Sequence, residues 1–205
     1  MAFLSERERR DVAQAIAAVE AKTRGELVTV IARASDDYLY IPLLWAALLA
    51  LAIPGALMLG GSAVALQYAY EAQVAGFLLF ALVFNLTPVK MRLIPRALKR
   101  VRAQRLAREQ FFAQNLHRTA ERTGVLLFVS VAERYVEILA DEGIHQRVPS
   151  GAWEQAVAEF TGAVRAGRVA EGFLRAIQTC GELLVEHFPA RPGDRNELPD
   201  HLIEL

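Results

Sequence analysis

Three carboxylates lie where predicted strands begin or end, and they are the side chains best suited to hold a cation. Glu26 opens a predicted strand over 26–32, and Asp141 and Glu142 follow a predicted strand over 134–140. If these strand ends meet at one edge of a sheet, the carboxylates can share Ca²⁺ or Mg²⁺, hard cations that take about six or more oxygen ligands. Alternatively, Glu26 and Asp141 cap a helix or a turn and Glu142 is solvated. The sequence has no Asp-x-Asp calcium loop, so any metal site would depend on the fold alone.

A charged turn between two predicted strands is the second candidate site. Glu133 and Arg134 follow the apolar run 125–131 and precede the alternating segment 134–140. As a pair they can bind an anionic group, and the alternative is an ordinary solvent-exposed turn. Both interpretations stay open at the level of sequence.

Several other chemistries are disfavoured by residue spacing. The histidines show neither H-x-x-x-H nor H-E-x-x-H spacing, so zinc is not expected. Ser130 lacks the G-x-S-x-G elbow of a hydrolase, and no phosphate-binding loop or dinucleotide fingerprint is present. The single Cys180 rules out an internal disulfide and a cysteine metal cage, and we expect it in the core.

A long apolar stretch dominates the middle of the chain. Between Asp37 and Lys90 the only formally charged residue is Glu71. This length is enough for two bilayer crossings of about 20 residues each. We predict a transmembrane helical hairpin over 38–89, with spans at about 41–60 and 67–86. The alternative is an apolar helical pair buried in a soluble core, which would need a much larger domain around it.

Basic residues set the expected orientation of this hairpin. A run of cations follows the second span, while the turn between the spans has no Lys or Arg. The positive-inside rule then places both termini in the cytoplasm of a bacterium, with a multi-pass protein in its inner membrane. The cations can contact anionic lipid headgroups, and this local clustering in a chain of net charge zero favours a membrane over nucleic acid. The cations are Lys90, Arg92, Arg96, Lys99, Arg100, Arg102, Arg105 and Arg108.

Helices and strands alternate on both sides of the hairpin. A Ser5 to Glu8 capping box predicts a helix start. A long helix is predicted over about 95–123, with Gly124 as its left-handed cap, and its imperfect register between Val101 and Phe112 indicates either a kink or two helices. Two more helices are predicted by apolar residues at helical spacing: Trp153, Val157, Phe160 and Val164 in one, and Phe173, Ile177, Cys180 and Leu184 in the other. The charged, proline-containing segment 189–205 is predicted to be a linker or tail.

The first 37 residues are too few to fold alone, so they need a partner after the hairpin. We therefore predict one α/β domain, formed by 1–37 and 90–188, that the hairpin interrupts. Its expected fold class is a small mixed β-sheet between layers of helices.

The strand segments resemble a known family. Thr23-Arg24-Gly25-Glu26 leading into LVTVIA, and Arg122-Thr123-Gly124 leading into VLLFVSVAERYVEILADEGI, are similar to the TPM domain. The likeness covers about 5–37 and 105–188. It implies an α/β/α sandwich with a small mixed sheet, and links to repair or assembly of membrane complexes, to metal binding and, in one plant branch, to acid phosphatase activity. The hairpin replaces the Trp-Gly-Ile-Gly-type segment of that family.

The favoured function is a membrane-anchored, cytoplasmic binding or assembly module for another membrane protein or complex. Its contact surfaces would be the segment 196–205 or the Tyr135 face of the strand 134–140. The alternative is a metal-dependent, phosphatase-like hydrolase that uses Glu26 and Asp141, since such an enzyme needs an activated water beside its metal.

Overall fold

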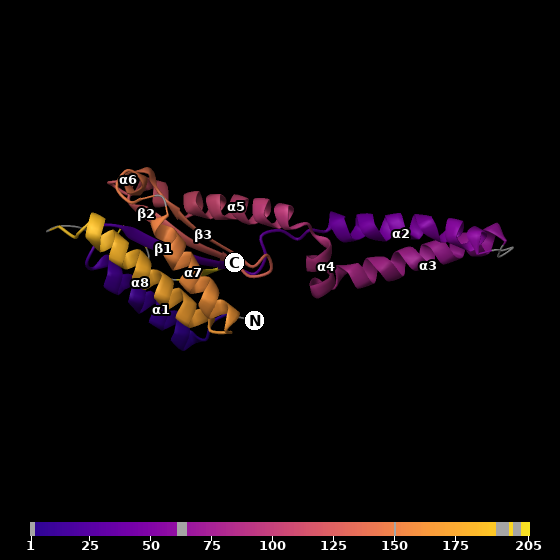
Figure 1. The fold of residues 1–205 in the computed structure, drawn as a ribbon, viewed down its shortest axis with the longest axis horizontal. Helices are drawn as coiled ribbons and strands as arrows, with labels where there is room; N and C mark the ends of the chain where they lie inside the picture. Colours follow the sequence, from indigo (N-terminus) through magenta and orange to yellow (C-terminus); the bar gives the residue numbers. More distant parts are fainter. Residues whose placement is uncertain (1–2, 61–64, 150, 192–196, 199–201) are drawn as a thin grey trace. The chain divides into compact units, whose positions relative to one another are not determined.

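The computed structural model describes residues 3–60, 65–149, 151–191, 197–198 and 202–205. Its packing divides the chain into two compact units. The first, here called the α/β unit, comprises Met1–Ser35 and Arg102–Leu205, and the second, the hairpin unit, comprises Asp36–Val101. In chain order the elements are α1 (Glu6–Glu20), β1 (Glu26–Ala32), α2 (Tyr40–Leu59), α3 (Leu66–Asn85), α4 (Thr87–Leu93), α5 (Arg96–Ala113), the 3-10 helix η1 (Leu116–Arg118), β2 (Gly124–Ser130), β3 (Tyr135–Ala140), α6 (Glu142–His145), α7 (Ala152–Arg165), α8 (Val169–His187) and β4 (Leu202–Glu204). Figure 1 labels all of them except η1 and β4.

The α/β unit is built on a mixed sheet, which confirms the predicted fold class. In the described part of the chain the sheet has four strands in the order β3-β2-β1-β4. β1 is parallel to β2 and to β4, whereas β2 and β3 are antiparallel. β1 is therefore an inner strand, and each of its residues is buried. This explains its nearly continuous run of β-branched and apolar residues.

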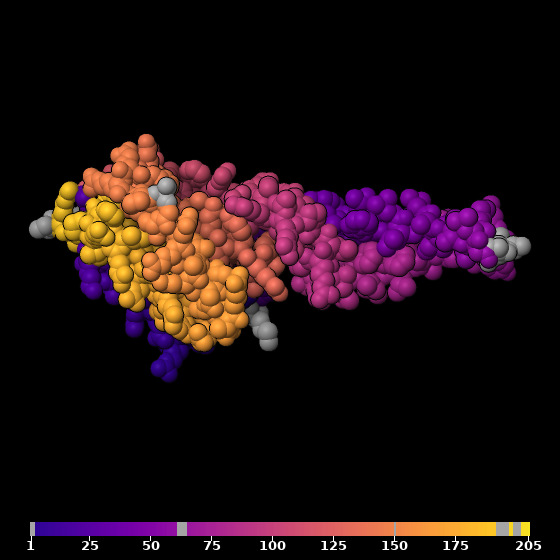
Figure 2. Space-filling model, viewed as in Figure 1, coloured from indigo at the N-terminus to yellow at the C-terminus, as the bar shows by residue number. Residues whose placement is uncertain are grey.

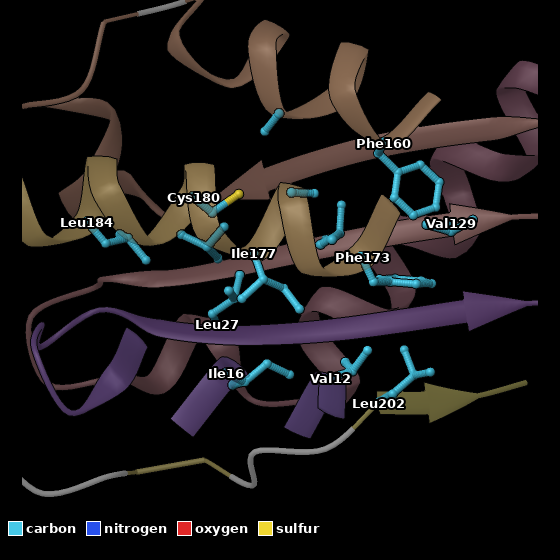
Figure 3. Packing of buried hydrophobic residues seen from close by; sticks show 14 of the residues in the cluster. Val12, Ile16, Leu27, Val129, Phe160, Phe173, Ile177, Cys180, Leu184 and Leu202 are labelled. Carbon is cyan, nitrogen blue, oxygen red and sulfur yellow. The ribbon is translucent and has the colours of Figure 1, made fainter. Parts of the chain in front are cut away.

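Helices cover both faces of the sheet (Figure 1). Alternate residues of β1 face opposite ways, because successive side chains of a strand point to opposite faces. Leu27 and Ile31 pack with α1, α7 and α8, as Figure 3 shows for Leu27 against the α1 and α8 side chains. Val28 and Val30 pack with residues of α5 on the other face. The unit is thus a three-layer sandwich.

Three local expectations are confirmed. Ser5 Oγ accepts a hydrogen bond from the Glu8 amide at 3.3 Å, and the Glu8 carboxylate accepts one from the Ser5 amide at 2.7 Å, which is the capping box that starts α1. The strand expected at 26–32 is β1 residue for residue. Cys180 is fully buried in the core that α8 forms with the sheet (Figure 3).

The predicted long helix over 95–123 was wrong at its end. α5 stops at Ala113, and Asn115 takes the left-handed conformation, at φ 60°, that the sequence pattern predicts for Gly124. Gly124 instead opens β2. A Cβ atom at Gly124 would lie 2.5 Å from the Leu116 carbonyl oxygen, so glycine is needed there because of close packing with η1.

The predicted tail was also partly wrong. Leu202–Glu204 forms β4 beside β1, with Leu202 paired to Thr29 and Glu204 to Ile31. Three residues are too short for a recognisable strand pattern, and only pairing with β1 defines this one. Much of the rest of the segment lies outside the described residues, including Asn196, the first residue of the contact surface predicted over 196–205.

In the hairpin unit, α2 and α3 are 20 residues each and lie along each other (Figure 2). They begin and end within one residue of the predicted spans, and α2 continues through Pro54. Gly76 of α3 packs so closely on Ile53 of α2 that a Cβ atom there would collide with its side chain. Among the described residues, these two helices are long and apolar enough to cross a membrane, which by itself is weak evidence.

Candidate functional site

The sheet brings the predicted metal-binding residues to one end, where β1 and β2 begin. Glu26 pairs with Gly124 in the parallel ladder, and the amide of Asp141 donates to the Gly124 carbonyl oxygen at 2.9 Å. Glu26 and Asp141 thus flank the start of β2 on its two sides. Parallel and antiparallel pairing with β2 places these distant carboxylates at the same end of the sheet, on either side of that strand.

The Glu26 carboxylate holds the segment that leads into β4. Its Oε1 accepts a hydrogen bond from the amide of Glu197 at 3.0 Å, and its Oε2 accepts one from the amide of Leu198 at 3.2 Å. The residue is only 5% exposed. Two charge-assisted hydrogen bonds stabilise the buried charge, so Glu26 has a clear structural role.

Asp141 caps the short helix α6. Its Oδ1 accepts from the Glu142 amide at 2.8 Å, and the Arg122 guanidinium lies 3.6 Å from the same oxygen. Its Oδ2 is buried and has no hydrogen-bond partner in the described part of the chain. Glu142 is exposed as the first residue of α6. The local geometry matches the capping interpretation of Asp141.

A cavity of about 420 Å³ opens beside Glu26. Its charged side chains already interact with one another or with the backbone. Glu121 pairs with Arg24 and, at 3.1 Å, with Arg191, while Glu20 accepts from the Leu27 amide at 2.9 Å. Across the described ranges, no group of three or more His, Cys, Asp or Glu side chains converges as metal ligands. The set Glu26, Asp141 and Glu142 stays a prediction.

The opposite end of the sheet carries the Glu133 and Arg134 turn, which spans 131–134. Glu133 is half-buried: its Oε1 accepts from the Ser35 amide at 3.0 Å, and its Oε2 accepts from the Ser130 hydroxyl. The Ser35 hydroxyl donates to Ser130 Oγ at 2.8 Å. Glu133 therefore fastens the turn to the segment after β1. Sequence reasoning missed Ser35, because it is remote in sequence from this turn.

Arg134 has a different environment from Glu133. It is exposed, adopts a left-handed backbone at φ 54°, and lines a cavity of about 590 Å³. The cavity lies at the carboxyl ends of β1 and β2, against the second half of α7. Arg165, the last residue of α7, lines it as well. Arg165 cannot be recognised from the sequence, since nothing in the local pattern relates α7 to the turn.

Comparisons with known proteins agree with this fold. Residues 92–183, a little under half of the chain, match the family model described as the TPM domain. The solved NMR structure of the BA42 protein from the psychrophilic bacterium Bizionia argentinensis is similar, with a TM-score of 0.64 and 18% sequence identity over 100% of this chain and 97% of that one. At that identity the likeness concerns the fold alone. No curated protein matches the sequence significantly.

Proposed function

We propose that this chain, which carries a TPM domain over residues 92–183, is a membrane-anchored binding or assembly module. In this proposal the α2–α3 hairpin crosses the bilayer. The α/β unit stays at the cytoplasmic side of a bacterial inner membrane and docks another membrane protein or complex.

The observation that carries the proposal is the exposure of α3. None of its residues is buried in the structure, although its side chains are mainly apolar. Leu78, Leu79 and Leu82 are 62%, 58% and 69% exposed. Water is a poor solvent for such a surface, and an exposed apolar patch of this kind needs lipid or protein around it. A helix of 20 residues is about 30 Å long, which matches the hydrocarbon thickness of a bilayer.

The distribution of charge supports the orientation. Lys90 and Arg92 lie in α4, directly after α3, and further cations follow in α5. The segment 60–65 between α2 and α3 has no charged residue. Positive residues stay on the cytoplasmic side during insertion, and each contributes about 1 kcal/mol of attraction to anionic headgroups near the surface.

The binding role has more support than the hydrolase alternative. The carboxylate of Glu26 accepts hydrogen bonds from the backbone of Glu197 and Leu198, and that of Asp141 accepts one from the first amide of α6. A metal-dependent hydrolase would require those oxygens for the ion and for a water activated by it. A module needs only an accessible surface.

Membrane extraction of the full-length protein tests the anchor. We expect the protein to stay in the bacterial membrane pellet after washing with alkaline carbonate and to dissolve in detergent. Replacing Leu78, Leu79 and Leu82 by Gln should reduce this retention, because each buried leucine contributes about 1.5–3 kcal/mol of transfer free energy. As a matched control, replacing the exposed residues Arg10, Gln146 and Glu182 by Ala should not reduce retention in the membrane pellet. Release of the wild-type protein by carbonate would contradict the anchor.

In vivo cross-linking separates the two functions. If the protein is a binding module, we expect the Asp141→Asn variant to be cross-linked to the same membrane proteins as the wild type. If it is a hydrolase, we expect Asp141→Asn to abolish cleavage of phosphate esters. Titration of Ca²⁺ and Mg²⁺ into wild type, Glu26→Gln and Asp141→Asn completes the test. Micromolar binding that both substitutions abolish would favour the enzyme.

A further inference from the structure

We propose that the cavity at the carboxyl ends of β1 and β2 binds an anion that carries a short apolar tail. Its volume of about 590 Å³ falls in the range of small-molecule sites. Ligands of open α/β sheets commonly bind outside the carboxyl ends of the strands, where loops leave room. Ile31, Val129 and Ser130 mark those strand ends in the cavity wall.

Two cationic side chains, Arg134 and Arg165, line the cavity, and no acidic side chain does so among the described residues. The Glu133 carboxylate lies behind the cavity-lining Ser130, from which it accepts a hydrogen bond. Neither arginine forms an ion pair with another described residue, whereas Arg24, Arg122, Arg168 and Arg175 of the same unit each pair with a carboxylate. A guanidinium has a planar fork of donors that matches carboxylate and phosphate oxygens. These two side chains therefore select an anion.

The apolar wall determines what the anion is attached to. Ile31, Val129 and Phe160 are buried and line the cavity, while Val131 and Val164 line it with 41% and 36% of their surface exposed. A small inorganic anion would leave these exposed valines in water. An alkyl chain would cover them and gain about 25 cal/mol for each Å² of apolar surface removed from water.

The cavity at the other end of the sheet is the natural comparison. It also contains arginines, but Arg24 and Arg191 are both paired there with Glu121. Two cavities of one unit thus differ in whether their cations are already neutralised. This difference makes the Arg134 and Arg165 cavity the site for an external anion.

The site can be tested by asking whether a ligand protects an introduced cysteine from maleimide labelling. The full-length protein is used for this, reconstituted in lipid nanodiscs of neutral phosphatidylcholine. Val164→Cys places a thiol at the cavity, and the native Cys180 gives no background because it is fully buried. Hexyl phosphate should slow maleimide labelling of Val164→Cys severalfold at saturation. It should not slow labelling of His145→Cys on α6. Absence of protection at Val164→Cys would overturn the proposal.

Matched probes and variants distinguish the contribution of the anionic group to binding from that of the apolar chain. We expect Arg134→Gln and Arg165→Gln each to weaken hexyl phosphate binding by about tenfold or more, as loss of a charge-assisted hydrogen bond implies. The exposed Arg10→Gln should have no effect, and Arg134→Lys should have an intermediate one. Equal protection by hexanol would overturn recognition of the anion, and equal protection by inorganic phosphate would overturn the role of the apolar wall.

Changing the lipid of the nanodisc shows whether the ligand comes from the bilayer or from solution. If phosphatidylglycerol discs protect Val164→Cys without any added probe, the ligand is an anionic lipid of the bilayer. If only dissolved hexyl phosphate protects, the ligand is a soluble amphiphile. Both results support the same chemistry, and both are independent of whether the protein captures a membrane partner.

Discussion

Two buried threonines of the α/β unit differ in a single hydrogen bond. Thr29 Oγ1, in the inner strand β1, has no hydrogen-bond partner in the described ranges. Thr123 Oγ1, just before β2, donates to the Arg24 carbonyl oxygen at 2.9 Å. Both side chains are almost completely buried. A buried hydroxyl without a partner destabilises the fold, while a satisfied one is neutral or favourable.

The same substitution should therefore act in opposite directions at the two positions. Thr29→Val should raise the free energy of unfolding by about 1 kcal/mol, because it removes an unsatisfied hydroxyl at nearly constant volume. Thr123→Val should lower that free energy by about 1–3 kcal/mol, because it leaves the Arg24 carbonyl without its partner. Denaturant midpoints measured in one detergent would check this, and a destabilised Thr29→Val would contradict it.

Because of Cys180, we expect the free energy of unfolding to depend on pH in the alkaline range. Burial, and secondarily the nearby charge of Glu159, raises the pKa of its thiol from 9.0 to about 12. The folded pKa is above the unfolded one, so the contribution of this group is fully present below pH 9.0 and is lost as the pH rises toward about 12.

We expect the wild type to lose about 2 kcal/mol more than Cys180→Ala between pH 9 and pH 11, since each unit of pH above the unfolded pKa costs about 1.4 kcal/mol per proton. Denaturant titrations at the two pH values measure the difference, and the variant corrects for every other titrating group. An equal loss in both proteins would show that the thiol is not buried in solution.

At the scale of elements, close packing of loops decides where two glycines are needed. Gly124 opens β2 against η1, and Gly143 lies in α6 against the loop before β2. A Cβ atom at Gly143 would collide with the Glu121 carbonyl oxygen and lie 2.7 Å from that of Arg122. Gly162 in α7 has no atom within 4 Å of its Cβ position among the described residues. The two carbonyl oxygens near Gly143 belong to the backbone, which cannot move aside as a flexible side chain can.

Gly143→Ala should consequently destabilise the protein by about 1–3 kcal/mol, as other overpacked positions do. Gly162→Ala is its control and should stabilise by up to about 1 kcal/mol, because alanine is the better helix former. Thermal unfolding of both variants checks the pair. A Gly143→Ala protein as stable as the wild type would mean that α6 can shift away from the loop.

At the scale of the whole molecule, the α/β unit is formed by two pieces of the chain, Met1–Ser35 and Arg102–Leu205. The inner strand β1 belongs to the shorter of these pieces. β1 lies before the hairpin, and its neighbours β2 and β4 both lie after it. Without β1, the inner edges of β2 and β4 would have no partner, and the core residues Leu27 and Ile31 would be missing. We therefore expect the two pieces to fold only together.

Replacing 38–89 by a short Gly/Ser linker should give a folded protein that no longer enters the membrane. A fragment of residues 102–205 should not fold, because it lacks the inner strand. Amide chemical-shift dispersion distinguishes folded from unfolded material in both proteins. A well-dispersed spectrum of the 102–205 fragment would disprove the need for β1.

Much of the local structure could be predicted from sequence because local chemistry determines it. The capping box of Ser5 and Glu8, the buried strand β1 and the two apolar helices each depend on residues close together in the chain. The end of α5 could not be predicted, since Asn115 rather than Gly124 takes the left-handed position. β4 could not be predicted either, because its three residues form a strand only beside β1.

By itself, the sequence determined that the chain has an α/β unit interrupted by a long apolar hairpin, because hydrophobic periodicity and charge depletion are local properties. Only the tertiary structure decided what the charged residues do. It showed that Glu26 holds the segment before β4, that Glu133 fastens its turn through Ser35 and Ser130, and that Arg134 and Arg165 line one cavity. The physical reason is that hydrogen-bond partners and cavities depend on which distant segments pack together.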